Sequence, residues 1–294
     1  MKSLTEYIKA YQINEARLYK GGEDLAKYIC KLVKENPDKD EFIINKEDLN
    51  FPNIFFKHLF VYVNEHLNEE LVAASYHTKK YSNKIDKIIG NILRWDDKEK
   101  IFNYVEISLQ TTSKEDRDID WTDISHELNH LKQDYDDKIK NPENDLFGDI
   151  DLEEYNISRK LYSTSNNRFE LISSYIKYAN VEFERESFSV QATEKFKENL
   201  DKYNNFSEAL DWQIKHNKIF IRYFLIYSWF TGCKESKDLS NSLCDTYRKT
   251  YKKSKNLSNE EIIDFLTNSF EEYYKALTED INNILDEYGK KNAL

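Results

Sequence analysis

The sequence contains few of the residues that interrupt regular structure. Only three prolines and six glycines occur among the 294 residues. All three prolines and four of the glycines lie before residue 150. Because both residue types weaken helices, their scarcity in the second half of the chain predicts long helices there.

Cysteine is also scarce. Cys30, Cys233 and Cys244 are an odd number of scattered residues without C-x-x-C spacing. A disulfide framework needs pairs of cysteines, and a zinc ribbon needs closely spaced thiols, so the sequence supports neither. We expect three buried thiols.

The chain lacks a long apolar run and an excess of positive charge. Its most apolar stretch, residues 219–230, contains Arg222 and is shorter than the roughly 20 residues that cross a bilayer. The N-terminus has no apolar segment typical of a signal peptide. The net charge of −11 gives an acidic surface that repels nucleic acid and anionic membranes. We therefore expect a cytoplasmic protein that binds neither.

Short runs typical of strands are present before residue 115. They are rich in β-branched or aromatic residues and bounded by polar clusters, at residues 42–45, 56–63, 70–77 and 102–110. In the last run, Val105, Ile107 and Leu109 alternate with polar residues, which predicts a strand with one buried face. We expect a small antiparallel sheet, preceded by helices at about residues 4–18 and 22–35.

Helical patterns fill the rest of the chain. They cover residues 165–178, 181–203, 206–230, 237–253 and 259–288. Ser258 and Glu261 have the spacing of a capping box before the last of these, and Gly289 is its expected end. The predicted fold class is α+β and predominantly helical. A small antiparallel sheet in the N-terminal half packs on the helix described next, and the C-terminal part is all helical.

Two of the six histidines lie within five positions, in the pattern H-E-x-x-H. On a helix, His126 and His130 project from one face, so both rings can reach one tetrahedral ion. Glu127 is rotated by about 100° from His126, where its carboxylate could polarise a bound water. An apolar stripe on the opposite side can pack on the sheet, and it consists of Ile124, Leu128, Leu131 and Tyr135. The alternative is a solvated helix with a chance pair of histidines.

A third protein ligand is expected for a catalytic zinc. If residues 181–193 are helical, Glu182 and Glu186 share a polar arc, whereas Glu184 points to the opposite side. A buried carboxylate is costly unless a cation compensates its charge. A zinc ion on His126 and His130 is one such cation. A lysine or arginine from another helix, or simple exposure of Glu184, stays open.

These residues together resemble a known group. His126-Glu127-x-x-His130, followed by Tyr178-x5-Glu184-x-Glu186-Ser187-x-Ser189, is similar to the gluzincin zinc metallopeptidases, particularly small phage and bacterial members. The resemblance covers roughly residues 100–195, and it departs from the family pattern at Glu182, Ser187 and Ser189. It implies His126, His130 and Glu184 as zinc ligands and Glu127 as general base. The predicted domains are then a zincin-like metallopeptidase domain at residues 1–203 and a helical C-terminal subdomain at residues 204–294.

The function that follows is zinc-dependent hydrolysis of peptide bonds in a peptide or protein substrate. Glu127 would take the proton of the metal-activated water and return it to the leaving amine. Tyr178 or Tyr162 would stabilise the oxyanion, with Tyr178 as the predicted catalytic residue. Asp137 could orient a histidine ring by accepting its second N–H, but we expect an ordinary surface acid there. The strand at 102–110 could pair with an extended substrate.

Other functions stay open. One alternative is a structural or interaction protein, such as a phage virion or regulatory component. It would keep an inactive zincin fold and bind a protein partner through its C-terminal helices. Another is a zinc hydrolase that acts on a different amide. The composition and the opening MKSLTEYI resemble proteins of phages of gut bacteria, which would place the protein in the host cytoplasm or the virion. We expect His58, His66 and His77 to be ordinary polar residues.

Overall fold

The computed structural model describes residues 19–65, 74–77, 95–111, 117, 119–140, 152–203 and 205–292. The chain forms two compact units, one of residues 18–148 and one that contains residues 149–294. The division expected after residue 203 falls within the second unit and stays a prediction. The helix expected at residues 4–18, His66 and the side chain of His77 lie outside what the structure describes.

A five-stranded sheet forms the centre of the first unit. Its strand order is β1 (Glu41–Asn45), β2 (Phe56–Glu65), β5 (Ile101–Thr111) and β3 (Ala74–His77), with β4 (Trp95–Asp96) also paired to β5. β2 and β5 run parallel, and the other pairs are antiparallel. The sheet is therefore mixed, and the prediction of an antiparallel sheet was wrong at this pair. Parallel neighbours need a long crossover, which residues 66–100 are long enough to provide.

The parallel pair carries the apolar core of this unit. Val105, Ile107 and Leu109 are buried, as their alternation predicted. The register places Leu59, Val61 and Val63 of β2 beside them. Hydrophobic side chains are thus stacked in rows across the two central strands, which stabilises the pairing.

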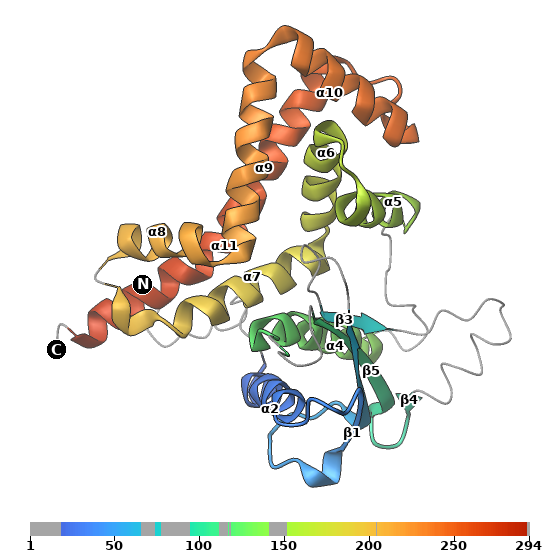
Figure 1. Ribbon diagram of the computed structural model, residues 1–294, viewed down its shortest axis with the longest axis vertical. Helices are drawn as coiled ribbons and strands as arrows, with labels where there is room; N and C mark the ends of the chain where they lie inside the picture. Colours follow the sequence, from blue (N-terminus) through green and yellow to red (C-terminus); the bar gives the residue numbers. More distant parts are fainter. Residues whose placement is uncertain are drawn as a thin grey trace, which may run out of the picture. The chain divides into compact units, whose positions relative to one another are not determined.

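Two helices pack in this unit (Figure 1). α2 (Gly22–Lys34) packs on α4 (Trp121–Lys140), and α4 packs on β3 and β5. The stripe residues Ile124, Leu128 and Leu131 of α4 are fully buried, so this packing follows the predicted face. Gly21 precedes α2 with a φ of 94°, and an added Cβ would lie 2.4 Å from the carbonyl oxygen of Pro52. Glycine is therefore required where α2 begins.

The second unit is helical over its described residues (Figure 1). Its helices are α5 (Leu152–Thr164), α6 (Arg168–Ala179), α7 (Glu182–Lys197), α8 (Phe206–His216), α9 (Lys218–Glu235), α10 (Lys237–Thr250) and α11 (Asn259–Asn292). Short 3-10 turns occur at η1 (Lys46–Asp48) in the first unit and at η2 (Leu200–Lys202) and η3 (Lys252–Ser254) in the second. The predicted α+β, predominantly helical fold class is confirmed.

Several helices differ from the prediction. α5 was not expected, and α11 continues beyond Gly289 to Asn292. The single helix expected at 206–230 is divided at Asn217, whose backbone is extended and whose side chain accepts a hydrogen bond from the N–H of Ile219. Asparagine favours such caps because its short side chain competes with the helix for backbone groups.

α11 organises the core of the second unit. It packs against α6, α7 and α10 through a buried apolar stripe at a spacing of three to four residues, which consists of Ile262, Leu266, Phe270, Tyr273, Leu277, Ile281 and Ile284. Phe270 stacks on Phe230 of α9 with ring centres 5.0 Å apart. The capping box is confirmed, because Ser258 and Glu261 each accept a hydrogen bond from the backbone N–H of the other.

The three cysteines are buried thiols, as expected. Burial raises the pKa of the Cys233 and Cys244 thiols, which keeps them protonated. Among the helices that the structure describes, none is both long and apolar enough to cross a membrane.

Candidate metal centre

The H-E-x-x-H sequence lies in the first half of α4, and this helix has a defined start. The carboxylate of Asp120 accepts hydrogen bonds from the backbone N–H and the hydroxyl of Thr122, at 3.0 and 2.8 Å. Asp120, the residue before the first helical residue, therefore caps α4. A side-chain oxygen on the first N–H groups fixes where the first turn forms, and hence where both histidines project.

The two histidine rings bring their Nε2 atoms close together. Their Nε2 atoms lie 3.1 Å apart, the ring centres are 4.7 Å apart, and the planes are nearly perpendicular at 87°. Two nitrogen ligands on a tetrahedral zinc, each about 2.0–2.1 Å from the ion, are separated by about 3.3 Å. The spacing of His126 and His130 therefore matches that of two ligands of one tetrahedral ion.

A neighbouring side chain fixes the orientation of His130. Its Nδ1 lies 3.0 Å from Oε1 of Gln133, one turn further along the helix. An amide oxygen only accepts hydrogen bonds, so Nδ1 is the donor in this contact, which in a neutral ring leaves the lone pair on Nε2. This is the usual arrangement of a metal-ligating histidine. Asp137 was suggested for this role, but Gln133 is the residue that makes the contact.

Glu127 is buried beside the pair and is only 7% exposed. It belongs to a run in which every residue from 121 to 129 is buried. Several members of the run are polar: Thr122, Asp123, Ser125, His126, Glu127 and Asn129. Burying polar groups is costly, so their concentration around the two histidines indicates a built polar site rather than a packing surface.

The third predicted ligand is placed by α7. Glu184 lies in the first turn of this helix and is 3% exposed, whereas Glu182 and Glu186 are exposed. The prediction that Glu184 alone points inward is confirmed. The start of a helix carries a partial positive charge, which stabilises a carboxylate there. The hydroxyl of Tyr155 in α5 donates a hydrogen bond to Oε1 of Glu184 at 2.7 Å.

His126, His130 and Glu184 form a group that could hold a metal ion. Each offers one ligand atom, and these atoms all lie within 4.8 Å of one another. His126 and Glu184 are buried, and His130 is half-buried. Two imidazole nitrogens and one carboxylate oxygen form the ligand set of several zinc hydrolases, in which water takes the fourth position.

Tyr178, the predicted catalytic tyrosine, belongs to an aromatic cluster of the second unit. Its ring centre lies 5.4 Å from that of Tyr162, 5.7 Å from that of Tyr155 and 6.0 Å from that of Phe188. The hydroxyl of Tyr162 accepts a hydrogen bond from Nη1 of Arg222 at 2.7 Å, and burial raises the pKa of Tyr162. A catalytic role for Tyr178 stays a prediction.

The sequence did not identify Tyr155, although it contacts Glu184 directly. It is one of 21 tyrosines, and it lies in a helix that was not predicted. No local pattern distinguishes it from the others.

The strand at 102–110 does not have a bare edge for an extended substrate. β5 pairs with β2 from Phe102 to Thr111 on one side. On its other side it pairs with β4 at residues 101–102 and with β3 at residues 106–109. The suggestion that this strand binds substrate was wrong, because its backbone groups already serve the sheet. His58 of β2 is hydrogen bonded to Asn45 at 2.9 Å, as an ordinary polar residue.

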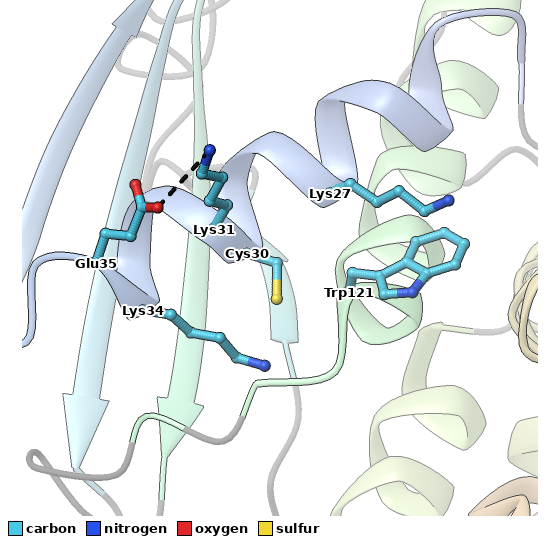
Figure 2. A pocket seen from close by; sticks show the side chains of 6 residues that line it. All are labelled: Lys27, Cys30, Lys31, Lys34, Glu35 and Trp121. Carbon is cyan, nitrogen blue, oxygen red and sulfur yellow. Dashed lines mark ion pairs between the residues drawn. The ribbon is translucent and has the colours of Figure 1, made fainter. Parts of the chain in front are cut away.

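Figure 2 shows a shallow hollow beside α2, lined by Lys27, Cys30, Lys31, Lys34, Glu35 and Trp121. Lys27 pairs with Glu23 at 2.5 Å and lies over the Trp121 ring, and Lys31 pairs with Glu35 at 3.7 Å. The Cys30 thiol donates to the carbonyl oxygen of Ile119 at 3.1 Å. No residue that lines this hollow belongs to the group of His126, His130 and Glu184, so the hollow is separate from the candidate metal centre.

No family model, curated protein or solved structure matches the chain. The resemblance to gluzincins therefore depends only on the H-E-x-x-H motif and the residues around Glu184. Function has to be inferred from the chemistry of these side chains.

Proposed function

We propose that the chain is a zinc-dependent metallopeptidase. His126, His130 and Glu184 hold the zinc ion, and Glu127 is the general base. The observation that carries this proposal is the grouping of the three ligand atoms within 4.8 Å, on residues spaced as H-E-x-x-H followed by a distant glutamate.

The donor set suits zinc better than the hard cations. Calcium and magnesium prefer six or more oxygen ligands, whereas two imidazoles and one carboxylate suit zinc and leave one position of a tetrahedron open. The Nε2 separation of 3.1 Å is close to the tetrahedral spacing. Gln133 supports the neutral His130 tautomer that ligates a metal.

When bound, zinc supplies Lewis acidity, which lowers the pKa of water toward about 7 and polarises the substrate carbonyl. Glu127 accepts the proton of the attacking water and delivers it to the leaving nitrogen of the peptide bond. We propose that the Tyr178 hydroxyl donates to the oxyanion.

The test is Glu127→Gln, with metal content measured by elemental analysis and hydrolysis measured on fluorescent peptide libraries and denatured casein. Loss of the general base should lower the hydrolysis rate by about 10²–10⁴-fold. Zinc should stay at the stoichiometry of the unchanged protein, because glutamine retains the shape of the side chain. Glu186→Gln, an exposed change in α7, is the control and should leave both quantities unchanged.

Two outcomes would overturn the proposal. Unchanged protein that binds no zinc, even when zinc is added, would remove the metal centre. Hydrolysis that survives Glu127→Gln would remove the proposed base.

A second candidate function is an interaction protein that keeps the metal centre without catalysis. Ile221 and Leu225 lie one turn apart on α9 and are 43% and 48% exposed, which favours a protein contact at this face. Stoichiometric zinc without hydrolysis of any substrate, together with isolation of the chain in a defined assembly, would favour this function over the first.

A further inference from the structure

The contact between Tyr155 and Glu184 joins α5 and α7 of the second unit. The hydroxyl donates to Oε1 at 2.7 Å, and the two residues are 8% and 3% exposed. A hydrogen bond to an ionised carboxylate is among the stronger ones in proteins, and burial reduces competition from water. The bond therefore constrains the position of Oε1 of Glu184 relative to α5.

Residues on both sides of Tyr155 tie α5 to neighbouring helices of the same unit. Immediately before it, Glu154 forms an ion pair with Lys177 of α6. One turn after it, the hydroxyls of Ser158 and Tyr251 lie 3.0 Å apart. Lys177 also lies over the Tyr251 ring, with Nζ 4.1 Å from its centre. These contacts hold the backbone that carries Tyr155, so its hydroxyl has a defined position before any ligand arrives.

The ring of Tyr155 is held as well. Its centre lies 5.7 Å from that of Tyr178 and 5.4 Å from that of Phe183. Aromatic packing of this kind restricts the ring to one rotamer. Since Phe183 immediately precedes Glu184, the same helical turn supplies both the packing surface and the acceptor.

We infer that Tyr155 is a positioning residue for Glu184, and that it holds this carboxylate in the orientation that ligates the metal ion. The inference rests on the proposed zinc site. An ionised carboxylate has about four acceptor positions on two oxygens, so one hydrogen bond at Oε1 is compatible with ligation. The hydroxyl is a neutral donor, which orients the ligand without adding charge beside the cation.

The test compares Tyr155→Phe with Tyr251→Phe. Each variant removes one buried hydroxyl hydrogen bond made with α5 and keeps its ring, but only the first change touches Glu184. Zinc affinity is measured by competition with a chromophoric chelator, and the visible absorption of the cobalt-substituted protein reports the geometry of the ligands. Thermal denaturation of both variants checks that they fold.

Tyr155→Phe should bind zinc about 10–100-fold more weakly and should change the cobalt spectrum, as loss of a partner that orients a metal ligand usually does. Tyr251→Phe should keep the affinity and the spectrum of the unchanged protein. Equal affinity in all three proteins would overturn the inference, and so would equal weakening in both variants, which would show a merely structural effect. Failure of the unchanged protein to bind zinc would instead overturn the proposed function.

Discussion

α4 and α11 bury their side chains in different ways. In α4, every residue from 121 to 129 is buried, and the buried set includes His126 and Glu127. In α11, the buried positions are mainly apolar and recur every three to four residues. Its buried Asp280 is hydrogen bonded to Ser189 of α7 at 3.1 Å. The first part of α4 is thus buried on all its faces, polar residues included. The buried side chains of α11 lie mainly in one apolar stripe.

The difference separates positions that serve stability from positions that serve function. Each buried Leu or Phe of α11 contributes about 1.5–3 kcal/mol through removal of apolar surface from water. A buried polar group contributes about 1 kcal/mol when it is paired, and it costs about 1–3 kcal/mol when it is not. The polar run of α4 is therefore a poor way to stabilise a helix. His126 of this run belongs to the group that could hold a metal ion.

α7 combines both patterns. Residues 189–194 are all buried, and this stretch contains Val190 and Ala192 together with polar residues. Glu184 stands apart from it in the first turn, where the helix end favours a negative charge. Position along the helix, as well as face, therefore distinguishes the candidate ligand from the packing residues.

Removal of a ligand from the polar run should have the largest effect on metal binding. His126→Ala leaves two protein ligands, and zinc affinity should fall by more than about 100-fold, beyond the 10–100-fold typical of a lost orienting partner. Zinc content after dialysis, measured by elemental analysis, checks this expectation. His58→Ala is the control, since His58 pairs with Asn45 in the sheet and should not affect zinc. Equal zinc in both variants would remove His126 from the site.

Truncation within the apolar stripe should affect stability most. Phe270 is fully buried and stacks on Phe230, so Phe270→Ala should lower the free energy of unfolding by about 3–5 kcal/mol. Urea denaturation measures the loss. Phe265→Ala on the same helix is the control, because Phe265 is 42% exposed and its truncation should cost far less. Similar losses for both would contradict the assignment of the stripe as the core.

Replacement of Gln133 tests whether the side chains around the histidines support zinc binding. Gln133→Leu removes the acceptor of the His130 Nδ1 proton, so the ring loses the partner that selects its tautomer. Zinc affinity should fall by about 10–100-fold, as measured by chelator competition. Asp137→Asn should leave the affinity unchanged. A reversed result would restore Asp137 as the orienting residue.

Periodic features were predictable from the sequence. The stripes of α4 and α11, the alternation in β5 and the inward side of Glu184 all follow from the residues of a single element. The capping box at Ser258 is likewise encoded within four positions. Local patterns determine which face of an element is buried, because 3.6-residue and two-residue periods are properties of the backbone.

Several features that depend on contacts between elements were not predictable. The parallel pairing of β2 with β5 joins segments separated by a long stretch of chain, and either direction would bury the same alternate residues. Tyr155 and Gln133 act through one specific partner each, and no spacing rule identifies them. Asn217 divides an apolar run whose periodicity alone predicts one helix.

The smallest predicted effect concerns the start of α11, where the helix depends on local hydrogen bonds and not on the stripe. Ser258 accepts a hydrogen bond from the N–H of Glu261 at 3.2 Å, and the Glu261 carboxylate accepts one from the N–H of Ser258 at 2.7 Å. Ser258→Ala should lower the free energy of unfolding by about 1 kcal/mol, measured by urea denaturation, and should leave zinc affinity unchanged.

The pH dependence of this cap follows from the same contacts. The backbone hydrogen bond from Ser258 lowers the pKa of Glu261 below its ordinary value of 4.5. A lowered folded-state pKa means that the stabilisation is fully present above the unfolded-state value and is lost as the pH falls through the lowered one. Denaturation of Glu261→Gln at pH 7 and pH 3 checks this, because the variant should differ from the unchanged protein more at pH 7. A difference that does not change with pH would show that the carboxylate charge has no part in the cap, and that the Ser258 hydroxyl caps α11 without it.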